Sequence, residues 1–438
     1  MKLRRCDSKL KTYTISEYGS FISEKEAEGY VTLPSHTFSA LEDFILSNNG
    51  KSEAIEFMGL SARKGIGRVI TAKNYVGIIT LKDGTTIEIL PKVYSSETYK
   101  DDKAKNLLIE MLKTLKRTPF KSFQTTSINT AKISIFEIFI RMFIDEVFGI
   151  VKRGLRSGYE SIQANERFFK GKLLFNKQVK YNYVHNERSY VEYDEFNLNR
   201  AENKLIKSTL SFLYKTTSSS KNKNDIKILL NSFSEVELST DYDSDFASIK
   251  NDRNTKDYSY ALLWSMVFLQ GKSFTAFSGS EVAIALLFPM ELLFESYIAA
   301  KLRKLLNSDE YSISTQDKTF HLFDAPKPEV QMKPDIVVKS RSDNSVFIID
   351  TKWKLLSDNK ANHGISQADM YQMYAYQKKY NAENVTLIYP KTDKVNSDEF
   401  EYSSSDAIVK VRFVDLFNPN KSLQNIISET EKMKIQNE

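Results

Sequence analysis

Residues 333–352 decide the fold of the C-terminal third, and they read K-P-D-I-V-V-K-S-R-S-D-N-S-V-F-I-I-D-T-K. Two apolar runs, 336–339 and 346–349, flank a turn rich in Ser, Asp and Asn, which predicts a β-hairpin. Asp335 opens the first strand and Asp350 closes the second, so a twisted hairpin brings both carboxylates together. Asp350 and Lys352 are two positions apart and therefore point to the same face of a strand.

Two carboxylates beside an ammonium group suit metal-dependent phosphodiester hydrolysis. Carboxylate oxygens are the ligands that Mg²⁺ prefers, and Mn²⁺ is the alternative. The metal polarises the scissile phosphate and lowers the pKa of a bound water. Lys352 orients that water or stabilises charge on the phosphate oxygens. An isolated D-x-K is usually a solvated surface ion pair, but the Pro-Asp context and the apolar strands favour a site.

Two flanking elements strengthen this interpretation. Gln372 and Tyr376 are spaced i, i+4 on an expected helix over 366–380, so they share one face. Upstream, Glu295 in L-F-E-S-Y lies on an expected helix over 289–306 and offers a third carboxylate. Each signal alone is weak, since Glu295 fits an exposed helix acid equally well and Tyr376 fits simple packing. The order of acidic helix, P-D strand, D-x-K strand, Q-x-x-x-Y helix and a further strand over 385–389 is far more specific.

Composition excludes several classes of protein. One cysteine in 438 residues rules out a disulfide framework and a cysteine zinc site within the chain. The four histidines are scattered and form no H-x-x-x-H pattern, so carboxylates would have to hold any metal. The N-terminus lacks a signal-peptide pattern and no apolar run spans a bilayer, which predicts a cytoplasmic protein without membrane contact. The net charge of +6 permits nucleic-acid binding without demanding it.

The chain divides into regions of different periodicity. Residues 1–100 are expected to form a β-rich, barrel-like domain, with a hairpin at Asp83-Gly84 and a basic turn over 61–68. Residues 101–275 read as a mainly helical middle domain, with helices over 133–151, 200–214 and 258–270. A mobile polar loop is expected over 216–224. Residues 276–420 are expected to form a self-contained α/β domain, followed by a polar tail over 421–438.

The C-terminal motifs resemble the PD-(D/E)xK nuclease superfamily, in its branch with a Q-x-x-x-Y helix. Over residues 60–415 the chain resembles the McrC family, the nuclease subunits of McrBC modification-dependent restriction systems. This resemblance outside the nuclease motifs rests on four stretches. They are V-G-I-I with I-E-I-L-P-K (76–79, 87–92), R-G-L-R-S-G-Y (153–159), K-G (170–171) and Y-D-E-F-N-L-N-R-A-E-N-K (193–204).

The resemblance implies a multidomain α+β fold and assigns roles to individual residues. The implied catalytic residues are Asp335, Asp350, Lys352, Glu295, Gln372 and Tyr376. The implied ligands for Mg²⁺, or for Mn²⁺, are Asp335, Asp350, the backbone carbonyl of Thr351 and Glu295. The implied partner is a McrB-like AAA+ GTPase hexamer, which the N-terminal part would dock onto and stimulate, and the implied substrate is modified double-stranded DNA.

Three functions stay open at this point. The first is a Mg²⁺-dependent DNA endonuclease subunit that also stimulates its partner's GTPase. The second is a non-catalytic activator or scaffold of an AAA+ NTPase, although the intact Asp335, Asp350 and Lys352 argue against lost catalysis. The third is a stand-alone PD-(D/E)xK repair nuclease, which the large N-terminal region makes less attractive. The chain carries no Walker loop, so it is not itself the motor. The basic turn at 63–68 is a candidate for stimulating the partner.

Overall fold

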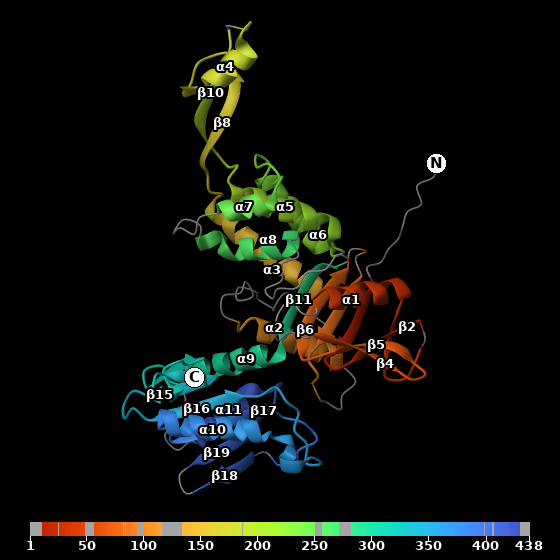
Figure 1. Cartoon of the computed structure of the whole chain (residues 1–438), viewed down its shortest axis with the longest axis vertical. Coiled ribbons are helices and arrows are strands. Elements are labelled where there is room, and N and C mark those ends of the chain that lie inside the picture. The colour runs from red at the N-terminus through yellow and green to blue at the C-terminus, as the bar shows by residue number, and fades with distance from the viewer. Residues whose placement is uncertain are drawn as a thin grey trace.

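The chain folds as a mixed α+β protein of several parts, seen here in a computed structural model (Figure 1). The structure describes residues 11–24, 26–48, 57–81, 83, 85–93, 100–115, 134–185, 187–249, 256–270, 282–397, 399–404 and 407–429. A C-terminal α/β domain occupies one end, a β-rich body and a helical region lie in the middle, and a thin arm forms the other end. No helix in the described ranges is long and apolar enough to cross a membrane.

The N-terminal body consists of two four-stranded sheets. The first has the order β1-β7-β6-β11 and the second β3-β2-β5-β4. Neither sheet closes on itself within the described residues, so the expectation of a barrel is wrong. Helix α1 packs with both sheets around one apolar core. The bounds are β1 (Thr12–Ser16), β2 (Ser20–Ser23), β3 (Val31–Leu33), α1 (Ser35–Asn48), β4 (Met58–Arg63), β5 (Gly67–Ala72), β6 (Tyr75–Leu81), β7 (Thr86–Leu90) and β11 (Val282–Pro289).

Two turns of this body match the sequence predictions. Strands β6 and β7 pair antiparallel around Asp83, whose Oδ1 accepts a hydrogen bond from Thr85 N at 2.8 Å. Gly84 lies outside the described residues. The basic stretch at 63–67 is the turn between β4 and β5, as expected.

Strand β11 belongs to the N-terminal sheet, whereas the boundary expected near residue 276 assigns it to the C-terminal domain. This strand pairs antiparallel with β6 and therefore completes the N-terminal sheet. The pairing depends on Gly77, whose φ is +136° and where a Cβ would lie only 1.9 Å from the Leu286 carbonyl oxygen. A strand of the N-terminal body thus leads directly into the first helix of the C-terminal domain.

The middle region contains the expected helices around a large apolar core. Gly154 ends α3 with a φ of +87°, and Lys152 and Arg153 lie in its last turn, where the sequence predicts a basic cap. The bounds are α2 (Lys100–Leu112), α3 (Ile135–Arg153), α5 (Ala201–Thr216), α6 (Ser220–Ser232), α7 (Tyr242–Ser248), a 3₁₀ turn (Lys256–Tyr258) and α8 (Ser259–Gln270).

The polar stretch over 216–224, expected as a mobile loop, is ordered by a buried carboxylate. Glu137 accepts hydrogen bonds from Thr217 Oγ1 at 2.6 Å, Ser218 N at 2.7 Å and Asn222 Nδ2 at 2.8 Å. Ser219 caps α6, which begins at Ser220. The Ser- and Asn-rich composition therefore supplies caps and hydrogen bonds to a helix start.

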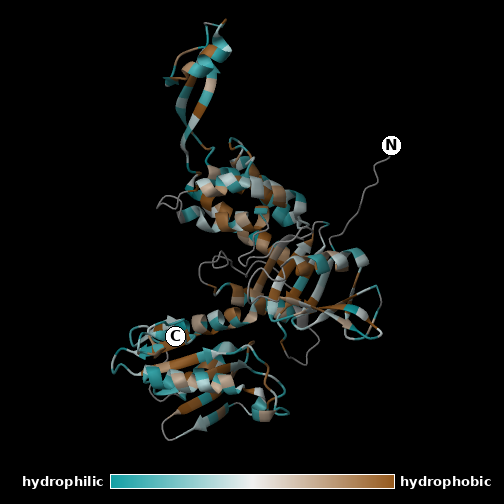
Figure 2. Ribbon diagram, in the orientation of Figure 1, coloured by the Kyte–Doolittle hydropathy of each residue, from teal (hydrophilic) through white to brown (hydrophobic). Residues whose placement is uncertain are grey.

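An arm projects from this helical region and makes the expectation of a mainly helical domain incomplete (Figure 1). Its two long strands pair antiparallel from Gly158↔Asn197 to Glu166↔Ser189. Gly171 has a φ of +69° and a Cβ there would lie 2.3 Å from the Glu192 carbonyl oxygen, which explains the K-G pair. Figure 2 shows mixed hydropathy along the arm, unlike the brown core strands elsewhere. The bounds are β8 (Gly158–Glu166), β9 (Lys172–Leu173), α4 (Phe175–Asn182) and β10 (Ser189–Asn197).

The C-terminal domain is built on a six-stranded sheet of order β12-β15-β16-β17-β19-β18. Strands β16, β17 and β19 are parallel to one another, and the other neighbours pair antiparallel. Helix α10 covers one face, while α9 and α11 cover the other. The bounds are α9 (Met290–Leu305), β12 (Tyr311–Thr315), β13 (His321–Phe323), β14 (Glu329–Gln331), β15 (Ile336–Ser340), β16 (Val346–Thr351), a 3₁₀ turn (Ala361–Gly364), α10 (Gln367–Tyr380), β17 (Asn384–Pro390), β18 (Glu399–Ser403), β19 (Ile408–Val414) and α11 (Pro419–Ser428).

Residues from 421 were expected as a polar tail, either helical or frayed, and helix α11 (Pro419–Ser428) is amphipathic there. It buries Leu423, Ile426 and Ile427 and packs against α9 and β19. These apolar residues recur at helical spacing, i, i+3 and i+4, so residues up to at least 428 belong to the domain. Residues 430–438 lie outside the described part of the chain.

Candidate active site

The β15–β16 hairpin places Asp335 beside the end of β16. Ile336 pairs with Ile349, so the next positions outward are Asp335 and Asp350. Asp335 Oδ2 accepts hydrogen bonds from both Thr351 N and Thr351 Oγ1, each at 2.8 Å. Thr351, which directly follows Asp350, therefore holds the Asp335 carboxylate in place.

Lys352 links the strand end to the neighbouring helix. Its Nζ lies 2.6 Å from Asp350 Oδ2 and donates to Gln372 Oε1 at 3.3 Å. Gln372 Nε2 in turn donates to Tyr376 Oη at 2.8 Å. The structure thus brings together Asp350, Lys352 and the Q-x-x-x-Y pair on α10, as the sequence predicts.

Glu295 reaches the site through a residue that the sequence did not suggest. Gln316 Nε2 donates to Glu295 Oε2 at 2.9 Å and lies 3.4 Å from Asp335 Oδ1. Gln316 follows β12 and has a φ of +52°. No motif marks it, because only the pairing of β12 with β15 brings it to Asp335.

Burial disfavours the ionised forms of Asp335 and Asp350, and the charge of Asp335 disfavours the ionised form of Asp350 further. Burial raises the pKa of Asp350, the charge of Asp335 raises it further, and Lys352 opposes both effects. Burial also raises the pKa of Asp335, against the hydrogen bonds from Thr351. Burial alone would lower the pKa of Lys352, but Asp350, Asp335 and Asp369 raise it overall. Asp369, in the first turn of α10, is a further charge at the site that no sequence motif marks.

The residues present fit a hard divalent cation. Asp350 is 1 % exposed, and a cation would relieve the repulsion and desolvation that raise the pKa values of both carboxylates. No group of three or more His, Cys, Asp or Glu residues in the described ranges is placed to hold an ion. Glu295 is connected to Asp335 through the side chain of Gln316. Ligation by Glu295 and by the Thr351 carbonyl stays a prediction.

The motifs outside this site hold the parts of the chain together. Glu88 of I-E-I-L-P-K is fully buried, lies 2.8 Å from Lys105 Nζ and accepts a hydrogen bond from Ile135 N at 2.8 Å. Asn203 Nδ2 donates to the carbonyls of Arg156 and Leu198 at 3.0 and 2.9 Å. These two motifs therefore anchor α2, α3 and the base of the arm.

The basic turn at 63–68 makes contacts only within the N-terminal body among those described. Arg63 donates to Tyr30 Oη at 2.6 Å, and Arg68 pairs with Glu42 at 2.5 Å. Nothing in its geometry distinguishes it as the stimulating element.

The C-terminal domain brings together the side chains of the P-D, D-x-K and Q-x-x-x-Y motifs. Two carboxylates and a lysine lie at neighbouring strand ends of a mixed sheet, beside a Q-x-x-x-Y helix. Residues 70–390 match the family described as "McrBC 5-methylcytosine restriction system component", and the chain belongs to this family.

A solved structure shows the same fold. The chain matches one in a half-complex of Thermococcus gammatolerans McrB AAA+ hexamers with bound McrC, with a TM-score of 0.64 and 18% identity. That match covers 95% of this chain and 100% of the other. A chain in the Thermococcus gammatolerans McrBC complex matches with a TM-score of 0.47 and 18% identity, over 67% of this chain and 88% of that one. No curated protein sequence matches the chain.

Proposed function

We propose that the chain is the Mg²⁺-dependent DNA endonuclease subunit of a McrBC-like restriction system. The observation that carries this proposal is the cluster of Asp335, Asp350 and Lys352, in which a buried and a half-buried carboxylate suit a cation and the lysine faces the same site. Membership of the McrBC family supports a role in restriction. Mg²⁺ is the expected ion, and Mn²⁺ would satisfy the same oxygen ligands.

Each residue has a distinct part in the proposed reaction. Asp335 and Asp350 would hold the cation, with Thr351 fixing the orientation of Asp335. A bound Mg²⁺ supplies polarisation of the scissile phosphate and a more acidic water ligand. Lys352 orients the attacking water or stabilises the charge on phosphate oxygens, and Gln372 holds the Lys352 ammonium group in place. Tyr376 positions Gln372 in turn.

Replacing Asp350 with Asn tests the nuclease directly. Asn keeps the volume of the side chain but removes the charge that binds the cation, so we expect cleavage to fall by about 10²-fold or more. The measurement is plasmid cleavage with partner, GTP and Mg²⁺ present. Asp309→Asn, at an exposed position, is the matched control and should cut normally. Near-normal cutting by Asp350→Asn would reject the assigned site.

We further propose that the chain works with a McrB-like AAA+ GTPase hexamer on modified double-stranded DNA and stimulates the partner's GTPase. The fold matches a chain from a complex of McrB hexamers with bound McrC. The resemblance points to the N-terminal part as the docking region. The arm is the better candidate surface, because Tyr159, Phe175 and Tyr183 on it are 78%, 73% and 82% exposed. Exposed aromatic side chains are enriched at protein interfaces.

A further inference from the structure

A basic cavity of about 320 Å³ lies where the N-terminal body meets the C-terminal domain. Four lysines from three segments line it, together with Glu17 and Trp353. Lys92 comes from the end of the I-E-I-L-P-K stretch, Lys354 and Lys360 come from the loop after β16, and Lys394 comes from the turn after β17. The nuclease site proposed above makes no use of these lysines.

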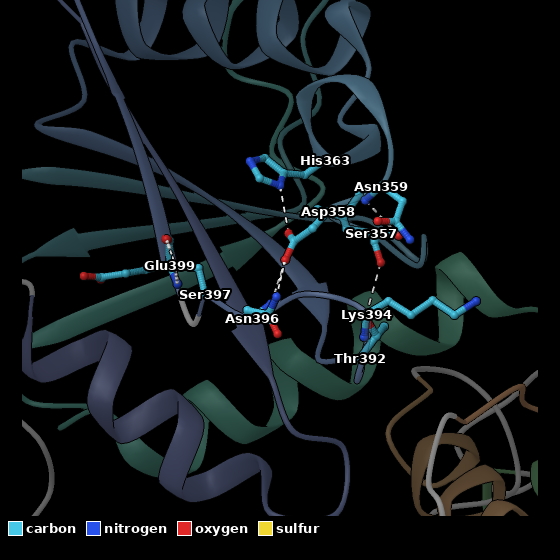
Figure 3. Close-up of polar contacts among 10 residues, drawn as sticks. Ser357, Asp358, Asn359, His363, Thr392, Lys394, Asn396, Ser397 and Glu399 are labelled. Atoms are coloured by element: carbon cyan, nitrogen blue, oxygen red, sulfur yellow. Dashed lines mark hydrogen bonds and ion pairs between the residues drawn. The ribbon is translucent and has the colours of Figure 1, made fainter.

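The two loops of the C-terminal domain that line this cavity are joined by hydrogen bonds (Figure 3). Asp358 Oδ2 accepts hydrogen bonds from Asn396 N and Nδ2, both at 3.0 Å, and Asp358 Oδ1 lies 3.0 Å from His363 Nδ1. Asp358 N donates to the Lys394 carbonyl at 3.0 Å. Figure 3 shows the Lys394 side chain extending away from this network. These hydrogen bonds hold the two loops that carry Lys360 and Lys394.

One carboxylate lines the cavity, and its oxygens are already engaged. Glu17 is 1 % exposed and accepts hydrogen bonds from Trp353 Nε1 at 2.9 Å and Lys92 N at 2.8 Å. Four lysines and one carboxylate line the cavity, so its lining carries a net positive charge. A cavity of this kind attracts anions.

We propose that this cavity binds a backbone phosphate of the nucleic-acid strand, beside the phosphate at the Asp335–Asp350 site. The proposal rests on the proposed nuclease function. Lys354 follows Lys352 by two residues, so their Cα atoms are at most about 7 Å apart, and one strand can reach both places. Lysine binds phosphate as a point charge and without base specificity.

Removing two of the lysines tests the proposal through the salt dependence of binding. The full-length chain and its Lys360→Ala/Lys394→Ala variant would be titrated with a fluorescent 20-bp duplex in Ca²⁺, which avoids cleavage, across a range of NaCl that starts low. For each phosphate that the variant no longer neutralises, the slope of log K against log[salt] should fall by about 0.9. We expect the slope to become shallower by about 1 to 2. The control Lys227→Ala/Lys421→Ala removes two exposed lysines elsewhere and should keep the original slope.

The outcomes separate this proposal from the nuclease function. An unchanged slope in the Lys360→Ala/Lys394→Ala variant, or no binding by the unmodified chain at the lowest salt, overturns the cavity assignment even if Mg²⁺-dependent cleavage is normal. A reduced slope supports it even if the Asp350 test fails. Inorganic phosphate and GTP serve as competing probes. If either raises the unfolding temperature in a lysine-dependent way while DNA binding is unaffected, the cavity takes a free anion and the DNA assignment is wrong.

Discussion

Glu17 and Trp353 are 336 residues apart, yet their contact joins the N-terminal body to the residue after Lys352. Burial raises the pKa of Glu17 to about 7, against hydrogen bonds from Lys92 and Trp353 that lower it. A carboxyl group whose pKa is raised in the folded state stabilises the protein at low pH. That contribution is complete below the unfolded pKa of 4.5 and is lost as pH rises through about 7.

Replacing Glu17 with Gln should therefore flatten the pH dependence of stability. The difference of 2.5 between the two pKa values corresponds to about 3 kcal/mol for the unmodified chain between pH 4.5 and 8. Urea unfolding, followed by the fluorescence of the two tryptophans, should give midpoints that fall with pH in the unmodified chain and change less in Glu17→Gln. The exposed Glu329→Gln is the control. Parallel pH profiles for all three proteins would contradict the assignment.

At the scale of elements, the β6–β11 pairing joins two regions that the sequence presents as separate domains. The apolar stretch 282–300 is divided between a strand of one body and α9 of the other. Gly77 makes the division possible, because only the absence of a side chain lets the two strands approach.

Gly77→Ala should destabilise this junction far more than a glycine change without a clash. The new Cβ would meet the Leu286 carbonyl oxygen at 1.9 Å, in a backbone conformation that alanine rarely adopts. Gly65→Ala is the matched control, since its φ is also positive, +82°, but nothing lies within 4 Å of its Cβ. We expect Gly65→Ala to cost about 1–2 kcal/mol and Gly77→Ala several kcal/mol or failure to fold. Thermal unfolding measures both, and equal shifts would show that the close approach is relieved cheaply.

At the scale of the whole molecule, the C-terminal domain is not self-contained. Its first helix continues from β11, α9 packs on α2, and Trp353 is bound to Glu17. A truncation that starts near residue 161 would leave β11 without its sheet and expose apolar surface. The expected independence of residues 276–420 is therefore not supported by the packing.

The arm, by contrast, can be removed without touching a core. Glu160 pairs with Glu195, so their Cα atoms lie about 5 Å apart and a short Gly-Ser turn can replace residues 161–194. We expect this variant to fold and to keep the Asp335–Asp350 site, but to lose stimulation of the partner's GTPase. Phe175→Ser/Tyr183→Ser should weaken stimulation in the same direction, while Ile228→Ser, 56% exposed on α6, should not.

GTP turnover by the partner is the measurement for the arm. If the shortened chain stimulates GTP turnover as well as the full chain does, the docking surface lies elsewhere, and the N-terminal body becomes the candidate.

The sequence by itself determined the hairpin of the C-terminal domain and the side chains it carries. Apolar strand runs, a polar turn and the two-residue spacing of Asp350 and Lys352 are local patterns, and the structure follows them. The i, i+4 spacing of Gln372 and Tyr376 was readable for the same reason. Local turn chemistry likewise predicted the β6–β7 hairpin and the basic end of α3.

Only the tertiary structure decided what those elements touch. Gln316, Glu17 and β11 meet their partners through strand pairings and packing between distant segments, which leave no periodic signal in the sequence. The arm escaped prediction because β8 and β10 carry mostly polar residues and bury only Val191 fully, so they show no apolar alternation. The stretch at 216–224 was expected as a mobile loop because its order depends on Glu137. This residue lies some 80 positions earlier in the chain and accepts hydrogen bonds from the polar groups of the stretch.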